Sequence, residues 1–186
     1  MDDTNYHILL DEVRQNFASV VWTHKIQEKQ ADIYAQKYKW LETTNILFSA
    51  ATSCGIVATI FTGGITAKII SAVLSFITLS IAAYFKSFDL KGMEQRHRNA
   101  ANNFIVIRNR LLHVISSLHM KDDFDEIYDE YKSTLSDLNK LYVDAPSTTD
   151  KAVHEATFAL KSNNEYTYTE DEIDHFLPPA LRGGIN

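Results

Sequence analysis

The sequence predicts an all-α membrane protein, in which a two-helix transmembrane hairpin is joined to cytoplasmic helices. Three observations predict this class. Between Thr43 and Phe85 the only charged residue is Lys68. On both sides of that segment apolar residues recur at spacings of three and four, the period of an amphipathic helix. Lysine and arginine residues flank the segment at both ends, as they flank membrane spans on the cytoplasmic side.

The first element is a cytoplasmic helix in residues 1–42. Apolar residues recur from Tyr6 to Trp40, and no proline or glycine interrupts them. A helix is expected to continue until such a breaker ends it. We therefore expect this helix to lead directly into the first membrane span.

The transmembrane hairpin is predicted for residues 43–85. Its spans, Thr43 to Thr62 and Ile65 to Phe85, each reach the roughly 20 residues that a hydrocarbon core about 30 Å thick requires. Gly63 and Gly64 form the turn between them, and Lys68 near the far end can extend its amine toward the interface. One alternative is a soluble helical protein that buries the hairpin permanently. Another is a colicin-like soluble form that buries the hairpin until it is triggered.

Flanking residues set the orientation of this hairpin. Basic residues precede the first span and follow the second; they are Lys25, Lys29, Lys37, Lys39, Lys86, Lys91, Arg96 and Arg98. The positive-inside rule then places both termini in the cytoplasm. Trp40 and Tyr84 stand at the same ends of the two spans, where amphipathic rings anchor a protein at the membrane interface.

Residues 86–145 are predicted to form a cytoplasmic helical hairpin. A long amphipathic helix covers Leu90 to Leu118, a turn-back follows at residues 119–123, and a second helix carries apolar residues from Phe124 to Tyr142. Together with the shorter helices that follow, they are expected to form a cytoplasmic C-terminal bundle.

The last region, residues 146–186, is predicted to hold short helices and a tail. Thr149 is a candidate N-cap for a helix that ends near Lys161. The run from Thr169 to Glu172 has the pattern of a capping box for one further turn, which ends at Pro178-Pro179.

Small and weakly polar residues form a stripe on each span. They are Ser71, Ser75, Thr78 and Ala82 in the second span, and Ala51, Gly55 and Thr59 in the first. Such residues let membrane helices approach closely, so one interpretation is helix packing within the hairpin or between protomers. The other interpretation is that a stripe lines a pore, which requires an oligomer because two helices cannot enclose a conduit.

No catalytic, metal-binding or cofactor-binding motif is present, so the protein is not expected to be an enzyme. The single cysteine, Cys54, excludes an intrachain disulfide. Residues 121–186 hold 6 basic and 15 acidic side chains, which argues against nucleic-acid binding. Four arginines are candidates for contacts with lipid headgroups or another anion, including a nucleotide held between protomers: Arg96, Arg98, Arg108 and Arg110.

The run Tyr38-Lys39-Trp40-Leu41 at the membrane entry, the small-residue hairpin with its Gly63-Gly64 turn, and the helical C-terminal region together resemble the SLATT family over roughly residues 10–142. These are two-transmembrane effector domains of bacterial nucleotide-signalling and reverse-transcriptase conflict systems. The resemblance implies an antiphage effector of the bacterial inner membrane. It also implies a separately encoded partner, either a nucleotide-synthesising enzyme or a reverse transcriptase, whose nucleotide product is a further candidate ligand.

Two functional hypotheses follow. As a pore-forming effector, the protein would assemble with copies of itself in the lipid bilayer and permeabilise it when a partner system signals infection, as in abortive infection. As a membrane-anchored adaptor or scaffold, it would recruit a soluble partner and leave the bilayer sealed.

Overall fold

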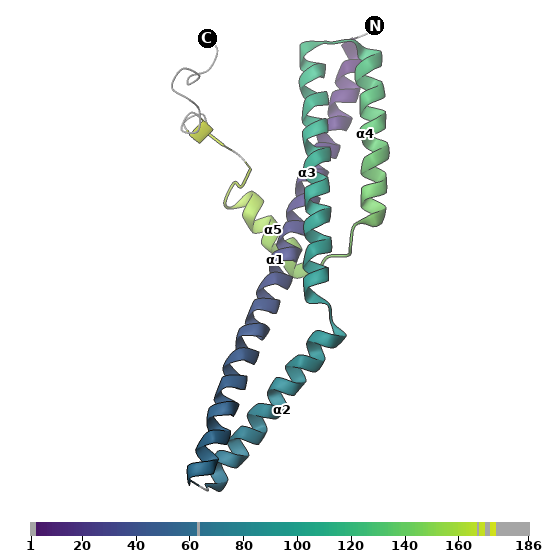
Figure 1. Ribbon diagram of the computed structural model, residues 1–186. Helices are drawn as coiled ribbons and strands as arrows, with labels where there is room; N and C mark the ends of the chain where they lie inside the picture. Colours follow the sequence, from purple (N-terminus) through teal and green to yellow (C-terminus); the bar gives the residue numbers. More distant parts are fainter. Residues whose placement is uncertain (1–2, 63, 167, 170–171, 174–186) are drawn as a thin grey trace.

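One helix runs the whole length of the molecule. The computed structural model describes residues 3–62, 64–166, 168–169 and 172–173, and α1 spans Asp3–Thr62 (Figure 1). Its 60 residues make a rod about 90 Å long at 1.5 Å per residue. The prediction that the N-terminal helix continues into the first membrane span is confirmed. The boundary between residues 42 and 43 therefore lies inside a continuous helix.

The hairpin is formed by the second half of α1 and by α2, Ile65–Ser87, which returns beside it (Figure 1). Gly64 is the N-cap of α2 and has an extended backbone, with φ −66° and ψ 127°, whereas Gly63 lies outside the described residues. None of the most apolar 18-residue stretch of α1 is buried, and only 11% of that of α2 is. The protein does not cover these apolar helices, so a soluble core built around the hairpin does not fit the structure.

A short joint separates the hairpin from α3, Leu90–Met120. Asp89 is the N-cap of α3, and its carboxylate accepts a 2.9 Å hydrogen bond from the backbone N–H of Gly92. A Cβ on Gly92 would overlap that carboxylate, which accounts for a glycine in the first turn of the helix.

The first half of α1 packs with α3 and α4, Phe124–Asp144, in a three-helix bundle (Figure 1). The predicted turn-back is confirmed, because α3 ends at Met120 and Asp123 caps the start of α4. The largest fully buried side chains in this core include Val13 of α1, Phe104 of α3 and Tyr131 of α4.

Two buried glutamines of α1 hold the segment that leads to α5, Asp150–Lys161. The Gln27 side-chain amide donates to the Pro146 carbonyl at 2.9 Å. The Gln30 carbonyl accepts from both the backbone N–H and the hydroxyl of Thr149, at 2.8 Å and 2.7 Å. Thr149 is the N-cap of α5, as predicted, so α5 starts at a point that α1 fixes.

Candidate functional site

A seam of small and weakly polar residues joins the two membrane helices. On α1 it is formed by half-buried side chains that recur at spacings of three and four: Asn45, Phe48, Thr52, Gly55 and Thr59. On α2 the residues turned toward α1 are Ser71, Leu74, Thr78 and Ile81. This spacing is the ridge-into-groove pattern of closely packed helices.

The closest approach in the seam joins Gly55 and Ser71. A Cβ on Gly55 would overlap the hydroxyl oxygen of Ser71, which would have to rotate away, so glycine allows the close approach at this crossing. Ser71 is buried, and its hydroxyl has no hydrogen-bond partner among the described residues; the same holds for the side-chain oxygen of Asn45. An unpaired polar atom in an apolar setting costs free energy, so the seam retains an unused capacity to bind a polar group.

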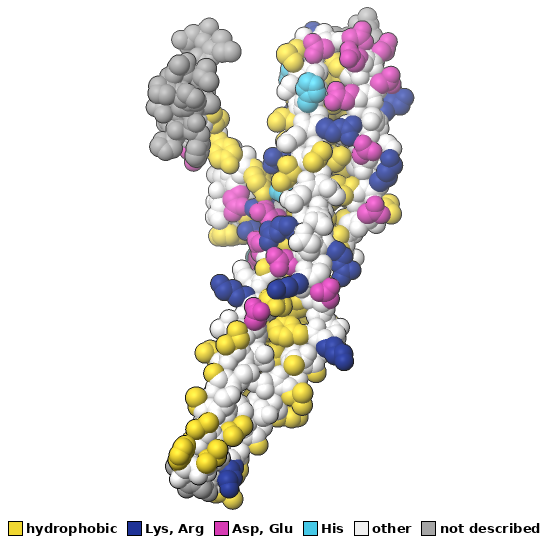
Figure 2. All heavy atoms as spheres, in the orientation of Figure 1, with side chains coloured by type: hydrophobic (Ala, Val, Ile, Leu, Met, Phe, Trp, Pro, Cys, Tyr) yellow, Lys and Arg dark blue, Asp and Glu magenta, His cyan; other side chains and the backbone are white. Residues whose placement is uncertain are grey.

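The structure divides the predicted stripes between two faces. Gly55, Thr59, Ser71 and Thr78 belong to the seam. Ala51, Ser75 and Ala82 are exposed instead, one helical position away from it. The outer surface of the hairpin is mostly apolar, and Phe61, near its tip, is 83% exposed. Its exposed hydroxyls include those of Ser53 and Ser80, which donate to carbonyls one turn back on their own helices. Lys68 is also exposed, in the first turn of α2. The bundle, by comparison, carries many charged side chains on its surface, as Figure 2 shows.

Aromatic rings and lysines gather where the hairpin meets the bundle. The rings of Tyr38 and Phe85 lie 5.2 Å apart between centroids, and the amine of Lys91 lies 4.4 Å from the Tyr38 centroid. The amine of Lys37 lies 5.1 Å from the centroid of Tyr84. Trp40, one of the two predicted anchors, is 67% exposed, whereas Tyr84 is half-buried between the helices.

The four candidate arginines of α3 do not form one site. The guanidinium of Arg98 contacts Asp32 of α1 at 3.1 Å, and that of Arg110 contacts Asp137 of α4 at 2.8 Å. Arg96 is exposed, and its Nε donates to the Gly92 carbonyl. Arg108 is half-buried and stands over the ring of Tyr166.

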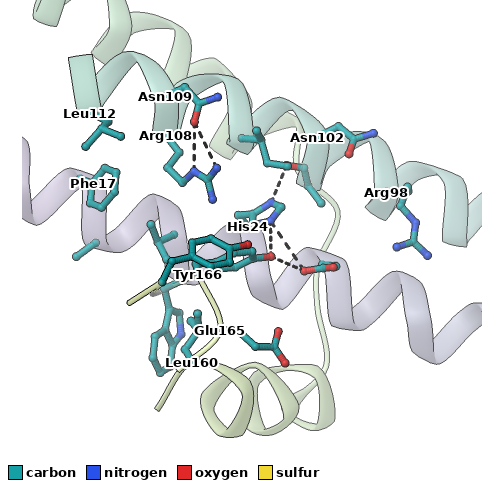
Figure 3. A pocket seen from close by; sticks show the side chains of 17 residues that line it. Phe17, His24, Arg98, Asn102, Arg108, Asn109, Leu112, Leu160, Glu165 and Tyr166 are labelled. Carbon is teal, nitrogen blue, oxygen red and sulfur yellow. Dashed lines mark hydrogen bonds and ion pairs between the residues drawn. The ribbon is translucent and has the colours of Figure 1, made fainter. Parts of the chain in front are cut away.

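A buried polar node on α1 fastens the chain beyond α5, and it was not predicted from the sequence. The amine of Lys25 binds the carboxylates of Glu28, at 2.8 Å, and of Glu165. The hydroxyl of Tyr166 donates to Glu28 at 2.7 Å and lies 2.9 Å from Nε2 of His24 (Figure 3). Only 4% of the Lys25 side chain is exposed, so these carboxylates provide its neutralisation.

Protonation equilibria in the node follow from its burial and its contacts. Burial lowers the pKa of His24 below its ordinary value. Its Nδ1 faces the Ala101 carbonyl at 2.9 Å, which only accepts, so Nδ1 carries the proton of the neutral ring. Burial alone would lower the pKa of Lys25, but its bonds to Glu165 and Glu28 raise it overall. Burial and the bond to Glu28 raise the pKa of Tyr166 to about 12.

No group of three or more His, Cys, Asp or Glu side chains suited to a metal ion occurs in the part of the chain that the structure describes. The hydrogen bonds and ion pairs of the node join α1 to the segment after α5 and neutralise the buried charge of Lys25.

The exposed apolar hairpin and the helical bundle that continues from it define a helical membrane protein with a two-helix hairpin. The chain belongs to the SMODS and SLOG-associating 2TM effector domain family 4, SLATT_4, whose model matches residues 9–172. The resemblance to the SLATT family stated from the sequence is thereby confirmed. No curated protein and no solved structure matches the chain.

Proposed function

We propose that this protein is a non-enzymatic effector of a bacterial defence system, which assembles with copies of itself and permeabilises the inner membrane when a partner system triggers it. The observation that carries the proposal is the seam between α1 and α2, in which Asn45 and Ser71 keep buried oxygen atoms without partners among the described residues. A helix that only anchors a protein in lipid needs no buried polar oxygens. A helix that exchanges its lipid contacts for contacts with protein or water needs polar groups of this kind.

Membership in the family supports the other parts of the proposal. A domain described as a two-transmembrane effector that associates with SMODS and SLOG acts downstream of another component. The partner proposed here is a separately encoded nucleotide-synthesising enzyme or a reverse transcriptase, acting directly or through its nucleotide product. Both termini are proposed to face the cytoplasm, because the lysines at the base of the hairpin follow the positive-inside rule.

Leakage from liposomes tests the proposal. The purified full chain is reconstituted into phosphatidylethanolamine and phosphatidylglycerol vesicles that contain a self-quenched dye, and dye release is followed by fluorescence. Release that rises more steeply than linearly with the protein-to-lipid ratio is expected, because assembly precedes permeabilisation. Vesicles that stay sealed at every ratio, and also after addition of the partner enzyme and its nucleotide product, would support a membrane-anchored adaptor instead.

Two leucine variants separate a role of the seam from general damage to the hairpin. Gly55→Leu places a large side chain inside the seam, whereas Ala50→Leu adds the same group on an exposed position of the same helix. The proposal expects changed release for the first variant and unchanged release for the second. Cys54 is the only cysteine and is exposed, so disulfide cross-linking between copies in the same vesicles reports assembly directly.

A further inference from the structure

A cavity of about 880 Å³ opens between α1, α3 and the side chains of Glu165, Tyr166 and Tyr168, in the bundle and away from the membrane hairpin (Figure 3). Small-molecule sites in proteins are typically about 300 to 1,000 Å³ and combine apolar walls with a few fixed polar groups. The size of this cavity is therefore that of a ligand site.

One part of the cavity is apolar and partly aromatic. Phe17 and Trp22 of α1 line it together with Leu112 of α3. Figure 3 shows Phe17 and Leu112 facing each other across the two helices. Trp22 is half-buried, and an indole face offers a flat apolar surface to a planar group.

The other part contains a guanidinium group with unused hydrogen-bonding capacity. Arg108 makes only two long bonds, both 3.4 Å, to the side-chain oxygen of its neighbour Asn109. No carboxylate lies within ion-pair distance of it in the described part of the chain, whereas Arg98 and Arg110 of the same helix are each paired with an aspartate. A half-buried guanidinium presents several N–H donors in a plane that matches a phosphate or carboxylate.

Tyr166 closes the cavity near Arg108. The ring centroid of Tyr166 lies 5.5 Å from the guanidinium carbon of Arg108 and 4.7 Å from the amine of Lys25. Its backbone φ is 72°, a left-handed conformation that is strained for a bulky residue and that is often found at ligand clamps. The hydroxyl donates its one proton to Glu28, and this bond holds the ring in this position, with the hydroxyl oxygen 2.9 Å from Nε2 of His24.

We propose that this cavity binds a small molecule that combines a planar ring with an anionic group of the phosphate type. The anion lies against Arg108, and the ring lies between the apolar wall around Trp22 and the ring of Tyr166. Asn109 supplies a further polar contact at the same end, and Asn102 lines the cavity farther along α3, toward Arg98. This site is separate from the seam of the hairpin, and binding at it does not depend on whether the hairpin permeabilises a membrane.

The test uses the full chain in lipid nanodiscs and 1-naphthyl phosphate as the probe, with binding measured by saturation-transfer difference NMR. Arg108→Gln is expected to weaken binding at least tenfold. Arg110→Gln is the matched control, because it removes a guanidinium from the same helix on the side that faces Asp137, and it should change the affinity by less than twofold. Inorganic phosphate alone is expected to bind at least tenfold more weakly than the probe.

A second variant keeps the test decisive if Arg108→Gln loses its fold. Asn109→Asp conserves shape at an exposed position of α3. It places a negative charge where the Asn109 oxygen lies 3.4 Å from the Arg108 guanidinium, in competition with the anion, so it should also weaken binding at least tenfold. Absence of binding to the wild-type chain would overturn the proposal. Equal affinity in the wild type and both cavity variants would overturn it too, and equal affinity for inorganic phosphate would refute the role of the planar ring.

Discussion

Gly55 of α1 and Ser71 of α2 lie in direct contact at the crossing of the membrane helices. Gly55→Ala is expected to destabilise the hairpin by about 1 to 3 kcal/mol, the usual cost of overpacking a fitted contact. Ser71→Ala in the same chain should recover most of the loss, because it removes the atom that the new Cβ meets. Thermal unfolding in detergent, followed by circular dichroism in a double-mutant cycle, measures this coupling.

Gln30→Ala is expected to release the start of α5. The variant leaves the N–H and hydroxyl of Thr149 without their shared acceptor. Thr149 is exposed, so water can replace that acceptor, and the cost should be about 0.5 to 1.5 kcal/mol. Hydrogen–deuterium exchange should accelerate at residues 149–153. Gln36→Ala is the control, since Gln36 is exposed on the same helix; equal acceleration in both variants would contradict the role of Gln30.

Tyr131→Phe is expected to weaken the docking of α4 on α1. The Tyr131 hydroxyl donates to Glu12 at 2.8 Å and accepts from Asn16 at 2.7 Å, and loss of these bonds should cost about 1 kcal/mol. The melting temperature of the bundle should fall accordingly. Tyr128→Phe makes the same chemical change at an exposed position of α4 and should leave the melting temperature unchanged.

Stability is expected to fall as the pH falls through the histidine range. Burial lowers the pKa of both His24 and His97 in the folded protein below the ordinary value of 6.5. The unfolded chain therefore binds more protons as the pH drops past 6.5, and protonation favours unfolding. Melting temperatures recorded between about pH 7.5 and about pH 5.5 should show this loss.

The double variant His24→Gln and His97→Gln should show a flatter pH dependence over the same interval. Around His24 the charged groups are Lys25, Glu28 and Arg108, and none of them changes charge there in an unfolded chain. His154→Gln, at an exposed position, is the control. An unchanged slope in the double variant would show that other groups cause the acid sensitivity.

Helix positions were predictable because their signals are local. The uninterrupted run into the membrane, the turn-back near Lys121 and the Thr149 cap depend on residues close together in the sequence. Lys121 adopts a left-handed φ of 58° at the end of α3, and the turn-back was still predicted from the restart of the apolar pattern. The Thr169 capping box also forms, with Glu172 accepting from the Thr169 N–H at 2.8 Å. Residues 178–179, proposed as its end, lie outside the described residues.

The candidate site was predicted less well, since its contacts join distant residues. Lys25 reads as a solvated flanking charge in the sequence, but it is buried against Glu165, far along the chain. Gln27 and Gln30 carried no expectation from the sequence, yet both are buried. A concentration of polar residues on the same face as Val13 and Val20 was the only available signal. Of the predicted stripe on α2, Ser71 lies in the seam, whereas Ser75 is exposed.

Because α1 is continuous, it links the bundle and the hairpin through a single helix. The glutamines that hold the start of α5 and the glycine at the membrane crossing belong to one helix without a break, so the angles between their side chains about the helix axis are fixed. A twist of α1 inside the bundle would therefore be carried toward the hairpin as a rotation of Gly55 relative to Ser71. No break in the helix separates the bundle from the hairpin along this axis.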